Sequence, residues 1–302
     1  MEISVCKIGG GALGVQKNST PEEIRAAYDR ALAIIDECKD RVILVLSALG
    51  KTTADLLSIS RSPSPITKRE TFEEVAAFHL RVARALKTDS RYLKALLADL
   101  EQKACASSEG SHVLPQEAVD EILSFGERMS VQIAVDYLRK KGASVGYVSA
   151  LRLVATGDTH HKGAVLDMLQ TRKNCARLES KIGRFDVVLT EGYIGKNQKT
   201  GAITLLGWNG SDLTAALLAG ICKAKLFLYK KIDKDGIPLE DCTAQVFREI
   251  FRGTGLVHDS VFDIMAEFPK LTLYITDIDT GKVFTISGSD ANSGDIIAKQ
   301  SN

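Results

Sequence analysis

The chain lacks the cysteine patterns of metal-binding and disulfide-rich proteins. Its 302 residues contain six cysteines, and no two of them have the C-x-x-C spacing of structural zinc motifs. Widely separated cysteines in a chain of this length also do not form a disulfide framework. We therefore expect reduced thiols and no metal ion held by protein side chains. The six are Cys6, Cys38, Cys105, Cys175, Cys222 and Cys242.

The chain also lacks long apolar runs and an excess of charge of either sign. No stretch approaches the roughly 18 apolar residues of a membrane span, and the N-terminus, MEISVCKIGGG, has no signal-peptide pattern. The formal net charge is +1, and lysine and arginine are scattered without a basic stripe. These absences predict a cytoplasmic protein that binds neither membranes nor nucleic acids.

The composition that is present is that of an ordinary globular protein with a sizeable core, because 45% of the residues are hydrophobic and 25% are charged. No internal repeat or low-complexity linker divides the chain. We therefore predict one domain over residues 1–290, with a mostly helical insertion at about 60–120, and a polar tail over 291–302.

The N-terminal segments predict a parallel sheet. Residues 3–8 and 42–46 are short apolar runs of strand length, and a helix lies between them. That helix starts with Thr20 as N-cap, Pro21 at the first helical position and Glu23 in a capping box. A strand, a helix and a strand of this kind are typical of a parallel sheet covered on both faces.

Later segments continue the same pattern. Residues 71–141 are mostly helical with a break near 106–115, Ser211 is expected to cap a helix that runs to Leu218, and two short helices precede the C-terminal strands. Further strands are expected at 144–148, 185–190, 202–206 and 225–229. A hairpin is expected from 271–275 and 282–286 around the turn at 279–281.

A glycine-rich loop at residues 9–11 follows the first predicted strand and gives the first chemical signal. Lys7 together with Gly9, Gly10 and Gly11 offers a positive charge and unhindered backbone amides, the groups that phosphate oxygens need. The pattern is neither a Walker A loop nor a dinucleotide fingerprint. A flexible turn without any ligand is the alternative.

Three further motifs are each ambiguous alone. Ser47 to Thr53 (SALGKTT) follows the second strand, where open parallel sheets bind ligands, or is a polar connection. Gly126 beside Glu127 interrupts a predicted helix, which suggests close approach of another group. The segment GWNGSD, residues 207–212, opens a helix that attracts an anion or merely carries a capping serine.

Taken in order, these motifs and the segment LTEGYIG at 189–195 resemble the aspartokinase catalytic domain from residue 3 to about 287. The resemblance implies the amino-acid kinase fold, an α/β three-layer αβα sandwich with a mainly parallel central sheet. It also implies ATP-dependent phosphoryl transfer to the side-chain carboxylate of aspartate, with Mg²⁺ bridging the nucleotide phosphates, and a homodimer.

The resemblance also implies roles for single residues. Lys7 neutralises phosphate charge, Asp212 orients Lys7, and the amides of Gly9, Gly10 and Gly11 hold the transferring group. At the amino-acid end, Glu127 pairs with the substrate ammonium. The other residues expected to face the amino acid are Ser47, Thr53, Trp208 and Ser211.

The chain departs from the family pattern mainly around the nucleotide and the substrate α-carboxylate. Trp208 replaces the arginine that clamps this carboxylate, and a neutral indole cannot reproduce a guanidinium fork. Lys230 and Lys231 replace a Thr-Asp pair that contacts the nucleotide; they either restore positive charge near the phosphates or are solvated surface lysines. The other departures are Gly11 and Ala12 for Thr-Ser, Asn209 for glycine, Thr243 for arginine, Gly255 for lysine and Asp259 for proline.

Three functional hypotheses follow. The first is an active kinase whose acceptor is aspartate or a related carboxylate. The second is a degenerate homologue that serves as a binding or regulatory subunit. An enzyme of the same fold with an unrelated acceptor, such as a carbamate or a phosphate ester, is a third. Because the chain ends where the family's regulatory ACT domains begin, feedback inhibition through such domains is not expected.

Overall fold

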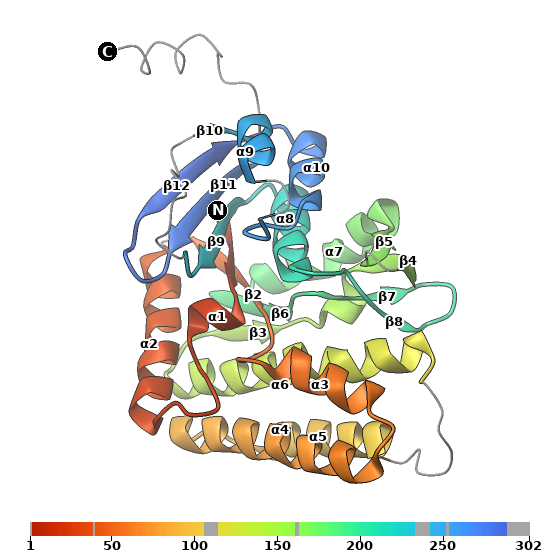
Figure 1. The fold of residues 1–302 in the computed structure, drawn as a ribbon. Helices are drawn as coiled ribbons and strands as arrows, with labels where there is room; N and C mark the ends of the chain where they lie inside the picture. Colours follow the sequence, from red (N-terminus) through yellow and green to blue (C-terminus); the bar gives the residue numbers. More distant parts are fainter. Residues whose placement is uncertain are drawn as a thin grey trace.

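The computed structural model describes residues 2–38, 40–105, 114–160, 163–232, 242–251 and 254–288. Its centre is an eight-stranded sheet in the order β10-β12-β11-β9-β1-β2-β6-β3 (Figure 1). Among the described strands of this sheet, all neighbours are parallel except β11 and β12. The strands are β1 (Ile3–Ile8), β2 (Arg41–Leu46), β3 (Val145–Tyr147), β6 (Val187–Glu191), β9 (Lys225–Lys230), β10 (Cys242–Thr243), β11 (Thr272–Asp277) and β12 (Val283–Ser287).

Helices cover both faces of this sheet, which confirms the predicted three-layer sandwich. On one face α8 packs against β1, β2 and β9, and α7 packs beside it; on the other face lie α2 and α6. In Figure 1, α4 and α5 form a further layer beyond α3 and α6. The described helices are α1 (Gly10–Leu13), α2 (Pro21–Glu37), α3 (Thr52–Arg61), α4 (Pro65–Leu86), α5 (Arg91–Cys105), α6 (Gln116–Lys140), α7 (Met168–Ile182), α8 (Gly210–Cys222), α9 (Ala244–Phe251) and α10 (Ser260–Glu267).

Strand β1 lies in the middle of the core because most of its residues on both faces are apolar. All of its residues after Ile3 are buried, and β2 has the same pattern after Arg41. Neither strand alternates between apolar and polar residues, as expected for strands covered on both faces. The capping box predicted at Thr20 is present at the start of α2. None of the described helices is long and apolar enough to span a bilayer.

Several elements were not predicted. A second, four-stranded sheet in the order β5-β4-β7-β8 lies beside the large one, and helix α7 precedes β6. The predicted strand at 202–206 exists but belongs to this small sheet. Its strands are β4 (Ala155–His160), β5 (Gly163–Leu166), β7 (Ile194–Asn197) and β8 (Ile203–Leu205). The predicted helical region at 71–141 starts earlier, at Pro65, and most of its predicted break lies outside the described residues, as does the tail at 291–302.

The glycine-rich loop at residues 9–11 was a wrong prediction. Gly10 and Gly11 belong to the short helix α1, and Gly9 is its N-cap. The amide of Leu13 donates to the carbonyl of Gly9 at 2.8 Å, and Ala12 and Leu13 are buried. Burial of this turn against the core outweighs the low helix propensity of glycine.

The predicted capping role of Ser211 was also wrong. Helix α8 begins at Gly210, and its N-cap is Asn209 in a left-handed conformation (φ 59°). Ser211 therefore lies in the first turn of the helix, where it is buried against Gly192; a Cβ atom on Gly192 would lie 2.4 Å from the Cβ of Ser211. Asparagine tolerates the left-handed region better than other residues with a side chain, so it can occupy the position of the family's glycine.

Candidate active site

The carboxyl ends of β1, β2 and β9 and the first turn of α8 surround a cavity of 690 Å³. This is the edge of an open parallel sheet at which ligands bind. The cavity gathers residues that are far apart in the chain and that the sequence had singled out. They are Lys7, Gly9, Gly10, Gly11, Ser47, Thr53, Glu127, Trp208, Ser211, Lys230 and Lys231.

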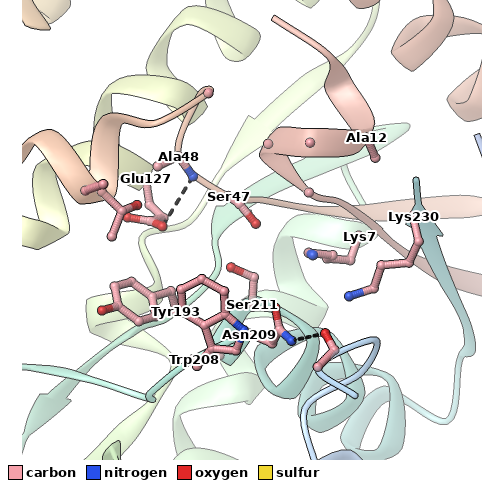
Figure 2. Close-up of a pocket in the computed structure, with 18 of the residues that line it drawn as sticks. Lys7, Ala12, Ser47, Ala48, Glu127, Tyr193, Trp208, Asn209, Ser211 and Lys230 are labelled. Carbon is pink, nitrogen blue, oxygen red and sulfur yellow. Dashed lines mark hydrogen bonds between the residues drawn. The ribbon is translucent and has the colours of Figure 1, made fainter. Parts of the chain in front are cut away.

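At one end of the cavity, two lysines form ion pairs with the same aspartate carboxylate. Lys7 Nζ lies 2.8 Å from one oxygen of Asp212, and Lys230 Nζ lies 2.5 Å from the other. Asp212 is fully buried. Both lysine side chains point into the same open space (Figure 2). Two cations around one anion leave a net positive charge, so this end of the cavity attracts an anionic ligand.

The charges of this cluster influence one another. Burial by itself raises the pKa of Asp212, but Lys7 and Lys230 outweigh it and hold the pKa below its ordinary value. Burial and the neighbouring Lys7 lower the pKa of Lys230 to about 8, although Asp212 opposes this shift. Asp212 is therefore ionised at neutral pH, and Lys230 is a cation that titrates close to the physiological range.

The two lysines at the end of β9 differ in their surroundings. Lys230 is 11% exposed and bound to Asp212. Lys231 lines the rim, is 59% exposed and lies 3.7 Å from the carboxylate of Asp279. The two alternatives for this pair thus apply to one lysine each: Lys230 adds charge to the site, and Lys231 is largely solvated.

The three glycines beside the lysine cluster differ in what a side chain at each position would contact. A Cβ atom on Gly9 would lie 3.0 Å from the Nζ of Lys7, and one on Gly10 would lie 2.3 Å from the carbonyl oxygen of Ala48. Nothing lies within 4 Å of the Cβ position of Gly11. The first amides of a helix have no partner within the helix. Cations, a bare backbone and free space together fit the oxygens of a phosphate group.

The opposite end of the cavity contains Glu127, which is 3% exposed. The amide of Ala48 donates to its Oε1 at 3.2 Å, whereas Oε2 has no hydrogen-bond partner among the described residues (Figure 2). Burial raises the pKa of Glu127 to about 8. A buried carboxyl oxygen without a hydrogen-bond partner lowers the stability of the fold. This position therefore favours a ligand that donates hydrogen bonds or carries a positive charge.

Close approach of another segment explains the glycine that precedes Glu127 within α6. A Cβ atom on Gly126 would lie 2.9 Å from the Cβ of Ala48. The connection between β2 and α3 therefore reaches the helix only because residue 126 has no side chain, and this contact brings the amide of Ala48 to Glu127. The sequence had indicated a close approach at this point.

Between the two ends, the hydroxyl-bearing residues Ser47 and Ser211 and the ring of Tyr193 face the space (Figure 2). The sequence had noted the segment around Tyr193 but had not assigned that residue to the site. Trp208 is 85% exposed at the mouth, and the Nδ2 of Asn209 donates to the carbonyl of Gly255 at 2.6 Å. An exposed indole at a cavity mouth offers an apolar face to a ligand.

The described residues contain no group of three or more histidine, cysteine, aspartate or glutamate side chains that could hold a metal ion. Glu127 is the only carboxylate among the described residues that line the cavity.

The comparison with protein families decides the relationship. The model of the amino acid kinase family matches residues 2–264. The chain belongs to the amino acid kinase family. Among curated members of this family, aspartokinase 1 of Arabidopsis thaliana, a chloroplastic protein, is 28% identical over 238 residues, which are 76% of this chain and 40% of that protein. The aspartokinase of Chlamydia muridarum is 26% identical and covers 87% of this chain and 54% of its own length.

Solved structures of family members agree with the fold. Escherichia coli aspartokinase III in complex with aspartate and ADP superposes with a TM-score of 0.80 at 20% identity, over 95% of this chain and 65% of that chain. The same enzyme with lysine and aspartate gives a TM-score of 0.82. This chain spans about half or less of the length of the curated aspartokinases named above.

Proposed function

We propose that this member of the amino acid kinase family transfers the γ-phosphoryl group of ATP to a carboxylate of a small amino acid, aspartate or a close relative. The observation that carries the proposal is the arrangement of two buried lysines on Asp212 facing Glu127 across one cavity. A polyanion and an amino acid fit the two ends of such a cavity at the same time.

At the nucleotide end, Lys7 and Lys230 contact the phosphates, and Asp212 holds both ammonium groups in place. Phosphoryl transfer needs little covalent help, so positioned positive charge is the main contribution of the protein. The backbone of Gly9, Gly10 and Gly11 allows the γ-phosphoryl group to come close to Lys7.

Mg²⁺ is part of the proposal through the family resemblance. Glu127, the only carboxylate among the described cavity-lining residues, belongs to the acceptor end. An ion at the phosphate end would therefore take its ligands from the nucleotide and from water, where it would neutralise phosphate charge.

At the acceptor end, Glu127 pairs with the ammonium group of the amino acid, and Ser47, Thr53 and Ser211 line its path to the phosphates. The acceptor carboxylate attacks the γ-phosphorus, the bond from this phosphorus to the β–γ bridging oxygen breaks, and ADP leaves. The charge that develops on the transferring group lies beside Lys7. Trp208 stands in place of the arginine that the resemblance expects, which supports an acceptor whose α-carboxylate is bound weakly or is absent.

The alternative of a degenerate regulatory subunit receives less support. This alternative was based on the loss of residues that contact the nucleotide in the family. However, Lys230 supplies a second, largely buried cation at the nucleotide end of the cavity. The homodimer and the cytoplasmic location remain parts of the proposal, and sedimentation of the purified chain tests the first.

Calorimetric titration with ATP tests the nucleotide end. We expect the Lys7→Met and Lys230→Met variants to bind ATP roughly 10- to 100-fold more weakly, because each loses a charged hydrogen bond to phosphate. The Lys231→Met variant, which removes an exposed lysine of the rim, is the matched control and should lose less than about threefold.

The same titration has a pH dependence. Since the pKa of Lys230 is about 8, its charge is present at pH 7 and largely lost at pH 9. ATP affinity should fall up to about tenfold between these values in the wild type and much less in Lys230→Met. Equal ATP affinity of all the proteins at pH 7 would exclude the lysine cluster as the phosphate site.

A further inference from the structure

Two cysteines from distant parts of the chain meet on the face of β1 opposite to that of Lys7. The sulfur atoms of Cys6 and Cys38 lie 3.7 Å apart, although 32 positions separate the residues. Both thiols are free. Cys6 is fully buried in β1, and Cys38 is the C-cap residue of α2.

Cys38 can be reached from solvent. It is partly exposed and lines a second cavity of 570 Å³, separate from the active-site cavity and bordered also by Glu2, Asp36 and Asp40. Cys6 lines neither cavity. A small oxidant would therefore reach Cys38 before Cys6, because Cys6 is buried.

The hydrogen bond between the two thiols makes them chemically unequal. With Cys6 as donor, it lowers the pKa of Cys38 and, together with burial, raises the pKa of Cys6. The thiolate is the nucleophile in sulfur chemistry. The accessible sulfur is thus the one that ionises more readily, and the buried sulfur keeps its proton.

We propose that Cys6 and Cys38 are a reversible oxidation site that closes to a disulfide when the protein meets hydrogen peroxide. The Cys38 thiolate attacks one peroxide oxygen, breaks the O–O bond and becomes a sulfenic acid, while the other oxygen leaves as hydroxide and takes up a proton to form water. The sulfur of Cys6 then attacks the sulfur of Cys38 and forms the S–S bond. The sulfenic oxygen leaves as a second water with the proton of Cys6. One peroxide is reduced by two electrons, and two thiols are oxidised.

The geometry permits this closure with a small movement. A disulfide requires a sulfur separation of about 2.0 Å, so the two sulfurs have to approach by roughly 1.7 Å. Cys38 is an extended residue (φ −73°, ψ 98°) beyond the last turn of α2, held by a 3.3 Å hydrogen bond from its amide to Ile34. Movement at this helix end leaves the central strand β1 in place.

The bridge would fasten the end of α2 to the strand that carries Lys7. Because successive residues of a strand point to opposite faces, Cys6 lies on the other face of β1 from Lys7, and it does not line the cavity. The disulfide therefore restrains the unfolded chain without entering the active site. Closing a loop of this length is expected to raise the melting temperature by roughly 5 °C in a protein of this size.

Peptide mapping of the folded, full-length protein tests the proposal. After treatment with hydrogen peroxide, we expect a peptide that joins Cys6 to Cys38, loss of both free thiols in parallel, a higher melting temperature, and full reversal by dithiothreitol. The Cys105→Ser variant is the control, because Cys105 at the end of α5 is partly exposed and lies far from this pair in the chain; it should behave like the wild type.

The Cys38→Ser variant should form no bridge and show no oxidation-dependent rise in melting temperature. Since Cys38 is only partly buried, this variant is expected to fold. Oxidation of Cys38 to a sulfinic acid without a joined peptide, or Cys6 left as a free thiol at full modification of Cys38, would overturn the proposal.

Discussion

Burial makes the ionised form of the Glu127 carboxyl group unfavourable until a ligand binds beside it. Its Oε2 has no hydrogen-bond partner among the described residues, and burial raises its pKa to about 8. An ammonium group bound beside it would replace the missing partner and stabilise the ionised form. Binding of an amino acid near pH 7 should then release a proton from Glu127.

The raised pKa of Glu127 has a defined effect on stability. A carboxyl group whose pKa is higher in the folded than in the unfolded protein stabilises the fold fully below about pH 4.5, and this contribution is lost as the pH rises through 8. We expect Glu127→Gln without ligand to be more stable than the wild type at pH 9, by on the order of 3 kcal/mol, and to lose this advantage towards pH 5. Urea unfolding of both proteins at the two pH values measures the effect, and a difference independent of pH would contradict it.

Trp208 is the residue at which acceptor specificity is expected to depart from aspartate. Its indole is 85% exposed at the cavity mouth, so a substitution there leaves the core intact. Arginine pairs with carboxylates in a bidentate fork, and tryptophan does not.

We expect Trp208→Arg to lower the KM for free aspartate at least roughly tenfold, the value of one charged hydrogen-bond pair. Trp208→Ala is the control, because it removes the ring without adding charge, and it should not lower the KM. The KM is measured by ADP release at saturating ATP. An unchanged or higher KM in Trp208→Arg would show that this position does not face the α-carboxylate.

At the residue scale the sequence predicted the composition of the cavity but not the state of each side chain. Lys7 was predicted because it lies at a strand end before three glycines. Glu127 was predicted through the family resemblance, and the glycine before it indicated only a close approach of another group. The difference between Lys230 and Lys231 could not be predicted, because it depends on which face each residue takes at the end of β9. Tyr193 was not assigned because nothing in its local sequence distinguishes a cavity residue from a core residue.

At the scale of elements, the contact between α1 and the connection after β2 shapes the phosphate end. Gly10 lies so close to Ala48 that a Cβ atom would be 2.3 Å from its carbonyl oxygen, a backbone atom that cannot move aside alone. Gly11, its neighbour in the same helix, has open space at the same position. The two glycines therefore form a matched pair for testing this contact.

We expect Gly10→Ala to destabilise the protein by about 1–3 kcal/mol through overpacking. Gly11→Ala should be neutral or stabilising by up to about 1 kcal/mol, because alanine favours a helix. Chemical unfolding of the two variants measures the difference. Equal effects of the two substitutions would show that the contact with Ala48 does not constrain α1.

Elements with strong local signals were predicted well. The capping box at Thr20 and the apolar runs of β1 and β2 gave α2 and the central strands. Helix α7 was missed because its sequence, MLQTRKNCARLESKI, is largely polar. The small sheet was missed because its strands are short and pair with segments that are distant in the chain. Tertiary packing, rather than local propensity, determines such elements.

At the scale of the whole molecule, the parallel order of the central sheet creates the site. Strands β9, β1 and β2 are neighbours, so their carboxyl ends bring Lys230, Lys7 and Ser47 to one edge although these residues are up to 223 positions apart. Helix α8 then places Asp212 beneath the two lysines. This convergence was predictable only through the resemblance to a known family, because pairing between distant strands leaves no signal in a single sequence.

The most direct test of the account is trapping of the acyl phosphate that carboxylate phosphorylation produces. The purified chain is incubated with ATP, Mg²⁺, hydroxylamine and a panel of amino acids that carry a side-chain carboxylate, aspartate included. We predict formation of a hydroxamate together with ADP for at least one acceptor, and its loss in the Lys7→Met variant. ADP and hydroxamate both absent with every acceptor, although the protein is folded and binds ATP, would contradict the proposed transfer.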